Sequence, residues 1–365
     1  MKHQYSSRIQ KIEAVLEKLL PESPGAAWAK EIFPDLEKIP DTEMLHNLTL
    51  PLRDLLARGG KRWRPLLMTL VCETLCGGEA ALPLSPLIEF CHNASLIHDD
   101  IEDNSDERRG KPAVHLLYGT DTAINSGCFL YFLPLSCIER WAQELIPQTL
   151  IAEEALINKV YTLWGVYLKR LHLGQSMDIS WHRNFESLPD MDDYFIMCSL
   201  KTGCLARFSA VLGVYAAAAV NSKALKHEKE LAQMYGEAAE KIGVGFQIID
   251  DVKNLCTGMP GKKRGDDIVE GKKSLPILIY LHRYPEQKSF VSHCFSAARA
   301  GGTQVSEAEE LIGAIDAAGI LREAEEKGRE LINQGRKAIS SALYADFALN
   351  EESRVLLEGL PDLIS

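Results

Sequence analysis

The sequence lacks the marks of a secreted or membrane-spanning protein. Its opening stretch, MKHQYSSRIQKIEAVLEKLL, contains no apolar core of the kind that a signal peptide needs. No apolar run approaches the roughly 20 residues that cross a membrane. No CxxC pair occurs, and the nine cysteines are scattered, as is typical of buried thiols in a reducing compartment. We therefore expect a cytoplasmic protein with no integral membrane segment.

Positive charge is also in short supply. The 365 residues include 40 Lys and Arg against 51 Asp and Glu, a formal net charge of -11, with 46% hydrophobic residues. This is the balance of an ordinary globular protein, and its acidic total argues against general binding of nucleic acid. An anionic substrate would need positive charge gathered locally.

A persistent β-alternation is missing, and so are the GxGxxG and phosphate-loop patterns. Apolar residues instead recur at helical spacing, which predicts an all-α helical bundle in one domain with its active-site cavity between helices. The main predicted helices cover 1–20, 66–76, 86–103, 122–140, 149–181, 190–219, 228–254, 274–284, 304–318 and 319–346. The helix over 122–140 is apolar nearly all round, so we expect it to be deeply buried.

The segment from His92 to His115 carries the first chemical motif. Asp99 and Asp103 are four residues apart on a predicted helix, so their carboxylates project from one face and repel each other unless a cation lies between them. Carboxylate oxygens suit Mg²⁺, and the following Arg108 and Arg109 suit phosphate oxygens. An acidic run is more often a solvated helix end, but this one precedes paired arginines. The pattern indicates a diphosphate site with Mg²⁺.

A second acidic pair, Asp250 and Asp251, follows Gln247 on another predicted helix and precedes a basic loop. Three further features fit a phosphate site and are equally compatible with plain surface polarity. They are the basic glycine turn RGGKRWRP at 58–65, the polar pair Gln175 and Asp178, and Lys201 within a mainly apolar helix.

Taken together and in order, these motifs resemble those of the trans-isoprenyl diphosphate synthases. The matching segments are GGKRWRP at 59–65, DDIED at 99–103, RRGKP at 108–112, KTG at 201–203, GFQIIDD at 245–251, DDVKN at 250–254 and EGKKSLP at 270–276. The similarity covers about 50–290 and is closest to the eukaryote-type geranylgeranyl diphosphate synthases. Asn254 departs from the third aspartate of many farnesyl synthases.

The resemblance implies an isoprenoid-synthase fold and a prenyltransferase reaction. An allylic diphosphate ionises, the double bond of isopentenyl diphosphate attacks the cation, and loss of a proton leaves a longer allylic diphosphate. It also implies a homodimer. Residues 1–45 would be an N-terminal helical extension, 46–290 the catalytic core, and 291–365 C-terminal helices packed on the same domain.

The resemblance also assigns roles to residues. Three Mg²⁺ ions are expected, two held by Asp99 and Asp103 and one by Asp250, with Asp100 and Asp251 in support. The allylic diphosphate would be bound by Arg108, Lys201, Thr202, Gln247, Lys262 and Lys272. Isopentenyl diphosphate would be bound by Lys61, Arg64, His92 and Arg109. The released diphosphate, or Thr202 and Gln247 near it, would accept the proton.

Chain length should depend on the helix face that precedes Asp99. Ala94 and Ser95 are small, so the tail of the product can pass them, and we expect a product longer than C15, with C20 as the best value. Phe90, Cys91, Phe129 or Phe132 would form the floor of the pocket. The alternatives are a farnesyl or longer-chain polyprenyl synthase, a class I terpene cyclase, and a non-catalytic regulatory subunit.

Overall fold

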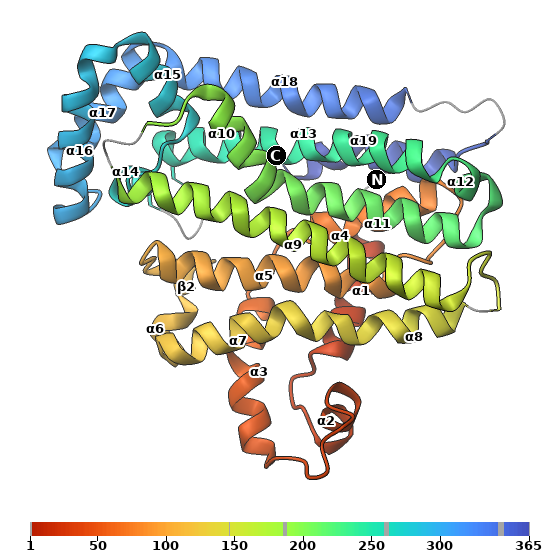
Figure 1. Cartoon of the computed structure of the whole chain (residues 1–365). Helices are drawn as coiled ribbons and strands as arrows, with labels where there is room; N and C mark the ends of the chain where they lie inside the picture. The colour runs from red at the N-terminus through yellow and green to blue at the C-terminus, as the bar shows by residue number, and fades with distance from the viewer. Residues whose placement is uncertain (1, 146, 185–187, 259–262, 342–346, 365) are drawn as a thin grey trace. The chain divides into compact units, whose positions relative to one another are not determined.

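The computed structural model describes residues 2–145, 147–184, 188–258, 263–341 and 347–364. Within these residues nearly all regular structure is helical, which confirms the all-α prediction. The exception is a short hairpin formed by β1 (Glu107–Arg108) and β2 (Lys111–Pro112). Internal contacts divide the chain into two compact units (Figure 1).

The first unit takes the described residues of 1–165, 208–236 and 339–364. Its helices are α1 (Lys2–Leu19), α2 (Ala26–Ile32), α3 (Thr42–Ala57), α4 (Trp63–Thr74), η1 (Leu82–Leu84), α5 (Ser85–Glu102), α6 (Val114–Tyr118), α7 (Thr120–Phe132), η2 (Leu133–Leu135), α8 (Ser136–Leu145), α12 (Ser222–Lys226) and α19 (Glu351–Ile364). α5 and α7 run side by side in Figure 1 and pack closely, while α4 contacts α5 and α19. α1 rests on α4 and α5, so the N-terminal helix belongs to the core of this unit.

The second unit takes the described residues of 166–207 and 237–338. Its helices are α10 (Met191–Cys198), η3 (Ser199–Gly203), α14 (Asp266–Glu270), α15 (Leu275–Arg283), η4 (Pro285–Gln287), α16 (Lys288–Gly301) and α17 (Ser306–Ala317). Four longer helices have residues in both units: α9 (Glu153–Arg183), α11 (Cys204–Val220), α13 (Glu228–Cys256) and α18 (Ile320–Ser340). An apolar core joins α10, α13 and α15 to α18, with Ile248 and Leu275 fully buried in it.

Most predicted helices are confirmed to within a few residues, but the one over 122–140 is wrong in two respects. The chain there forms α7, the 3₁₀ turn η2 and α8, because Pro134 lacks an N–H and its ring clashes with the preceding turn. The segment is also not deeply buried: Ile124 and Phe132 are 44% and 58% exposed. α7 buries Ala123, Leu130 and Tyr131, whereas Ile124 and Phe132 face outward.

The chain over the predicted helix 190–219 is helical from Met191 onward, but it is not one uninterrupted α-helix. A turn of π-helix, Ser199–Gly203, separates α10 from α11. The stretch Met191–Val220 is long and apolar enough to cross a membrane, yet 89% of its most apolar window is buried, as in the core helix of a globular protein. A π-turn inside a buried helix redirects side chains, and this one carries Lys201 and Thr202.

Candidate active site

The first acidic cluster lies where α5 ends. Asp100 is fully buried, and its Oδ1 accepts a hydrogen bond of 2.8 Å from Arg108 Nε and a second from Arg108 Nη2. Arg108 Nη2 also lies 3.6 Å from Asp99 Oδ2. Burial raises the pKa of Asp100, while Arg108 opposes that shift. Asp99 and Asp103 keep part of their surface open to solvent.

The donor set of this cluster fits Mg²⁺. Asp99 and Asp103 supply only oxygen ligands, and the buried Oδ2 of Asp100 has no hydrogen-bond donor, which suits a position beside a cation. Among the described residues, no three His, Cys, Asp or Glu side chains converge well enough to hold a metal by themselves. Mg²⁺ is commonly bound by one or two carboxylates and completed by water and substrate phosphates, so this arrangement suits an ion that arrives with a diphosphate.

The hairpin after α5 directs two arginines to different partners. Arg109 and Gly110 form its turn with φ of 55° and 76°, the left-handed geometry of tight two-residue turns. Arg108 reaches back to Asp100, whereas Arg109 Nη1 donates to the carbonyl of Gly59 and lies 3.3 Å from Asn93 Oδ1. Burial lowers the pKa of Arg109 to about 10, and the neighbouring Arg62 adds to that shift.

The glycine turn before α4 gathers the residues expected to bind isopentenyl diphosphate. Gly59 and Gly60 have φ of 85° and 145°, and a Cβ on Gly60 would lie 3.1 Å from Arg109 Nη2. Two glycines therefore let the chain turn tightly beneath a guanidinium. The exposed Lys61 donates from Nζ to the carbonyl oxygen of Ile364 at the end of α19.

Arg64 and His92 meet across this turn. Arg64 Nη1 lies 3.3 Å from His92 Nε2, and the guanidinium stacks over the Trp63 ring at 4.5 Å. Burial lowers the pKa of His92 well below its usual value, with Arg64 and Arg109 adding to the shift. His92 is therefore neutral near pH 7 and offers a neutral imidazole beside two cations. The structure thus brings Arg64, His92 and Arg109 around one short turn, with Lys61 on that turn.

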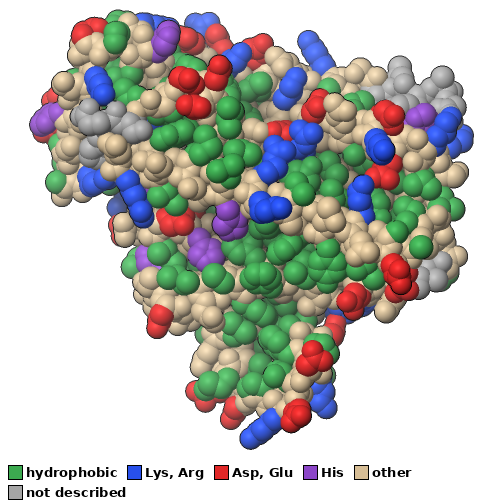
Figure 2. Space-filling model, viewed as in Figure 1, with side chains coloured by type: hydrophobic (Ala, Val, Ile, Leu, Met, Phe, Trp, Pro, Cys, Tyr) green, Lys and Arg blue, Asp and Glu red, His purple; other side chains and the backbone are tan. Residues whose placement is uncertain are grey.

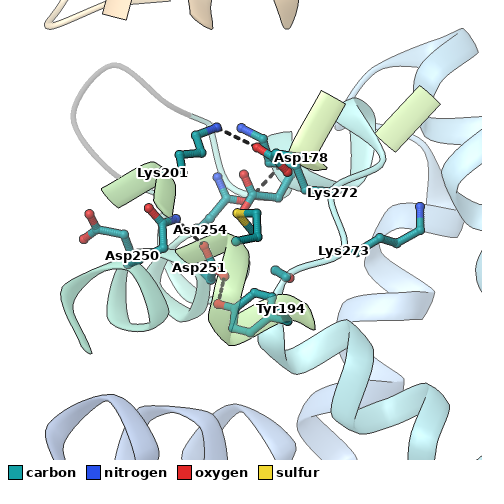
Figure 3. A pocket seen from close by; sticks show the side chains of 12 residues that line it. Asp178, Tyr194, Lys201, Asp250, Asp251, Asn254, Lys272 and Lys273 are labelled. Atoms are coloured by element: carbon teal, nitrogen blue, oxygen red, sulfur yellow. Dashed lines mark hydrogen bonds and ion pairs between the residues drawn. The ribbon is translucent and has the colours of Figure 1, made fainter. Parts of the chain in front are cut away.

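The second acidic cluster surrounds a pocket in the other unit (Figure 3). The pocket is lined by Asp178, Tyr194, Met197, Lys201, Gln247, Asp250, Asp251, Asn254, Asp267, Lys272, Lys273 and Ser274. Lys201 Nζ donates to Asp178 Oδ2 at 2.6 Å, and Lys272 Nζ pairs with Glu270 Oε2 at 2.6 Å. The sequence left open whether Lys201 and Asp178 belong to a phosphate site or to a polar surface. In the structure they form an ion pair with each other, and both side chains are mostly buried.

Asp250 and Asp251 are adjacent in sequence but differ in environment. Asp250 is exposed, and its carboxylate points away from Asp251 in Figure 3. Asp251 is buried: its Oδ1 accepts from Gln247 Nε2 and its Oδ2 from the Tyr194 hydroxyl, both at 2.8 Å. Gln247 Oε1 in turn accepts from Thr202 Oγ1 at 2.8 Å. Asp251 therefore holds the side chains of its neighbours in place, whereas Asp250 is exposed to solvent.

Burial raises the pKa of Asp251 to about 7, and nearby Asp267 adds to that shift. Because an unfolded aspartate has a pKa of about 3.9, the neutral carboxyl stabilises the fold fully below about pH 4. That stabilisation is lost as the pH rises through about 7. Relative to Asp251→Asn, which cannot titrate, the wild type should lose about 1 kcal/mol of unfolding free energy per pH unit in this window. Urea unfolding in EDTA at several pH values tests this, and parallel pH profiles for the two proteins would contradict it.

Asn254 stands where many farnesyl synthases have a third aspartate, and its side chain forms hydrogen bonds with the segment that follows α13. It is 1% exposed, its Oδ1 accepts from the backbone N–H of Asp267 at 3.1 Å, and its Nδ2 donates to the carbonyl of Lys263 at 3.4 Å. An amide serves here because one position must both accept and donate. Lys262, predicted to bind the allylic diphosphate, lies outside the described residues.

Sequence reasoning did not assign Tyr194 or Lys273. Lys273 is 2% exposed; its Nζ donates to the carbonyl of Gly271 at 2.9 Å and lies 4.6 Å from the centre of the Phe295 ring. Burial lowers the pKa of Lys273 to about 8. The run of two lysines was visible in the sequence, but which of them turns inward was not.

The residues expected to set the chain length of the product differ in how deeply they are buried. Ala94, Phe90 and Cys91 are fully buried, and Ser95 is half-buried with its Oγ donating to the carbonyl of His92. Of the aromatic residues considered for the pocket floor, Phe129 stacks on Phe33 with 5.9 Å between ring centres. Phe132 is 58% exposed in this unit, and its expected place at the floor stays a prediction.

Comparison with known proteins identifies the class. The sequence profile of the polyprenyl synthetase family matches residues 45–312, and the chain belongs to this family. It is 32% identical over 320 residues to the geranylfarnesyl diphosphate synthase of Aeropyrum pernix, a match that covers 85% of this chain and 91% of that protein. It is 33% identical over 242 residues to a geranylgeranyl pyrophosphate synthase of the eukaryote Neocamarosporium betae, covering 66% of this chain and 63% of that protein.

The fold matches as well. The crystal structure of geranylgeranyl pyrophosphate synthetase from Pyrococcus horikoshii aligns with a TM-score of 0.78 at 26% sequence identity. The alignment covers 99% of this chain and 97% of that one. The resemblance inferred from the sequence motifs is thus confirmed at the level of family and fold, and the protein is a prenyltransferase.

Proposed function

We propose that this protein catalyses the Mg²⁺-dependent 1′-4 condensation of isopentenyl diphosphate with an allylic diphosphate, giving a trans-prenyl diphosphate. The observation that carries the proposal is that each of two carboxylate clusters lies beside basic side chains. The cluster with Asp99 and Asp103 lies beside Arg108, and the cluster with Asp250 lines a pocket with Lys201 and Lys272. An acyclic condensation needs positive charge for two diphosphates, and the chain provides it in spite of its net charge of -11.

Each cluster has a distinct role in this proposal. Mg²⁺, once bound by Asp99, Asp103 and Asp250, would neutralise the charge that develops on the leaving diphosphate. Arg108, Lys201 and Lys272 orient the same diphosphate, and Lys201 exchanges its pairing with Asp178 for a phosphate oxygen. Lys61, Arg64, His92 and Arg109 hold isopentenyl diphosphate. Thr202 and Gln247, fixed by Asp251, stand near the released diphosphate that takes up the proton.

The metal requirement and the cyclase alternative are tested in one assay. Purified protein is treated with EDTA, and consumption of labelled isopentenyl diphosphate is followed as Mg²⁺ is restored. Activity should return only with the metal and only when both substrates are present. A hydrocarbon product formed from the allylic diphosphate alone would favour the cyclase instead.

A C20 product is proposed because the wall before Asp99 carries small side chains. Ala94→Phe is expected to shorten the main product to C15 or less, because a phenyl ring fills the space that the tail would occupy. Since Ala94 is fully buried, the variant should also lose stability by about 1–3 kcal/mol. Product length after dephosphorylation, together with thermal unfolding, separates the two effects. A folded variant with unchanged product length would remove Ala94 from the pocket wall.

We further propose a homodimer in the cytoplasm. Outward-facing apolar side chains gather over α6, α7 and the neighbouring start of α9 (Figure 2), namely Leu116, Leu117, Ile124, Phe132 and Tyr161. Contiguous exposed apolar side chains of this kind are typical of an interface between subunits. None of the nine cysteines, all of which lie among the described residues, forms a disulfide, in keeping with a reducing compartment.

A further inference from the structure

A chain of polar side chains, of which Arg62, Glu89 and Asn93 are buried, connects the N-terminal helix to the glycine turn of the proposed isopentenyl diphosphate site. Arg62, between Lys61 and Arg64, is 3% exposed, whereas its neighbour Lys61 is exposed. Its Nε donates to Glu13 Oε1 of α1 at 2.7 Å, and its Nη1 donates to Glu89 Oε1 of α5 at 2.8 Å. One guanidinium thus joins two helices that are far apart in sequence.

The same guanidinium also fixes the backbone of the turn. Arg62 Nη2 donates to the carbonyl of Leu56 at 2.7 Å and Nη1 to that of Gly59 at 3.2 Å. Arg62 itself has φ of 46°, a left-handed conformation that a non-glycine residue adopts only when its surroundings impose it. Its side-chain contacts therefore hold a strained residue at the start of α4.

The chain of contacts continues to a second residue of the proposed site. Asn93 Nδ2 donates to Glu89 Oε1 at 3.0 Å, and Asn93 Oδ1 lies 3.3 Å from Arg109 Nη1. Burial alone would lower the pKa of Arg62, but Glu89 and Glu13 raise it above its usual value, so the guanidinium stays charged. Glu13, Arg62, Glu89, Asn93 and Arg109 form one continuous network.

α1 is itself firmly held, so Glu13 is presented at a fixed place. Ile12 and Leu16 are fully buried, and the Tyr5 hydroxyl donates to the carbonyl of Leu356 in α19 at 2.6 Å. Arg8 Nη2 pairs with Glu73 Oε2 of α4 at 2.7 Å. The position of the helix therefore keeps the Glu13 side chain, which is 33% exposed, within reach of Arg62.

We infer that α1 takes part in substrate binding: Glu13, by holding Arg62, is a positioning residue that sets where Lys61 and Arg64 stand to receive isopentenyl diphosphate. The inference rests on the proposed function and assigns to the N-terminal segment a role in that reaction. Neither Glu13 nor Arg62 touches the substrate. They act by fixing the turn that carries the two cations.

The test compares Glu13→Gln with Glu17→Gln, one turn further along the same helix and exposed. Glu13→Gln keeps the shape but removes the charge that faces Arg62. It should raise KM for isopentenyl diphosphate by roughly three- to tenfold, the effect of losing part of a charge-assisted contact. KM for the allylic substrate and kcat should change by less than about twofold. Glu17→Gln should change none of them.

A double-mutant cycle shows whether the effect passes through the turn. In a Lys61→Ala background, Glu13→Gln should raise KM for isopentenyl diphosphate by a smaller factor than in the wild type. An unchanged KM in Glu13→Gln, or an equal rise for both substrates, would overturn the inference and leave the proposed function standing. Wild-type protein that neither binds nor consumes isopentenyl diphosphate would overturn both.

Discussion

Asp99→Ala is expected to lower kcat by about two to three orders of magnitude while the protein remains folded, and Asp250→Ala should do the same. Each variant removes an oxygen ligand from a cluster that is proposed to neutralise the leaving diphosphate. Asp99 retains solvent exposure and Asp250 is exposed, so truncating them creates no buried cavity. The loss should therefore appear in turnover rather than in stability.

The measurement is steady-state turnover at saturating Mg²⁺, paired with thermal unfolding. Asp106→Ala is the matched control, because Asp106 is exposed and follows the same helix a few residues later. It should retain activity within about twofold. If Asp99→Ala and Asp250→Ala also kept full activity, the assignment of these carboxylates to the metal would be wrong.

Gly174→Ala is expected to lower both stability and turnover. A Cβ on Gly174 would lie 2.7 Å from the carbonyl carbon of Leu200 and closer still to the backbone nitrogen of Lys201. These are backbone atoms of the π-turn, so no flexible side chain can move aside. α9 and the π-turn would have to separate, which would disturb the ion pair between Lys201 and Asp178.

The expected loss is about 1–3 kcal/mol in unfolding free energy, the usual range for overpacking, with a fall in kcat because Lys201 and Thr202 shift together. Gly165→Ala in the same helix is a matched control. Nothing lies within 4 Å of a Cβ at that position. Gly165→Ala should therefore stabilise the protein by about 0.5–1 kcal/mol through helix propensity. Urea unfolding and turnover of both variants decide the matter. A Gly174→Ala variant as stable and active as wild type would show that the close approach is unimportant.

The sequence allowed the helical architecture and both acidic motifs to be predicted, because these depend on local spacing. Asp99 and Asp103 are four residues apart, so any helix places their carboxylates on the same face. Spacing alone could not show which of two adjacent acids turns inward, although the resemblance assigned the metal to Asp250 and a supporting role to Asp251. The difference in burial comes from what α10 and α15 bring against Asp251. The partner of Lys201 depends on the close crossing of α9 at Gly174.

Two features were misjudged or missed for a related reason. One face of α7 is exposed, which contradicts the expected deep burial. An apolar helix surface favours contact with other apolar surfaces, but the sequence does not show which part of the protein provides that contact. The pairing of Arg62 with Glu13 joins residues 49 positions apart, and no periodicity reports such a contact. The basic turn appeared as one group of cations, in which the resemblance assigned roles to Lys61 and Arg64 but not to Arg62. The structure gives these three side chains different surroundings.

The most direct test of the account is an analysis of the product. Purified protein is incubated with Mg²⁺, isopentenyl diphosphate and each of the C5, C10 and C15 allylic diphosphates, and the dephosphorylated products are separated by length. We expect a single C20 alcohol from every primer and none when isopentenyl diphosphate is omitted. A longer or shorter linear alcohol would keep the reaction and refute the proposed pocket wall. The absence of any prenyl product from all three primers would contradict the central claim.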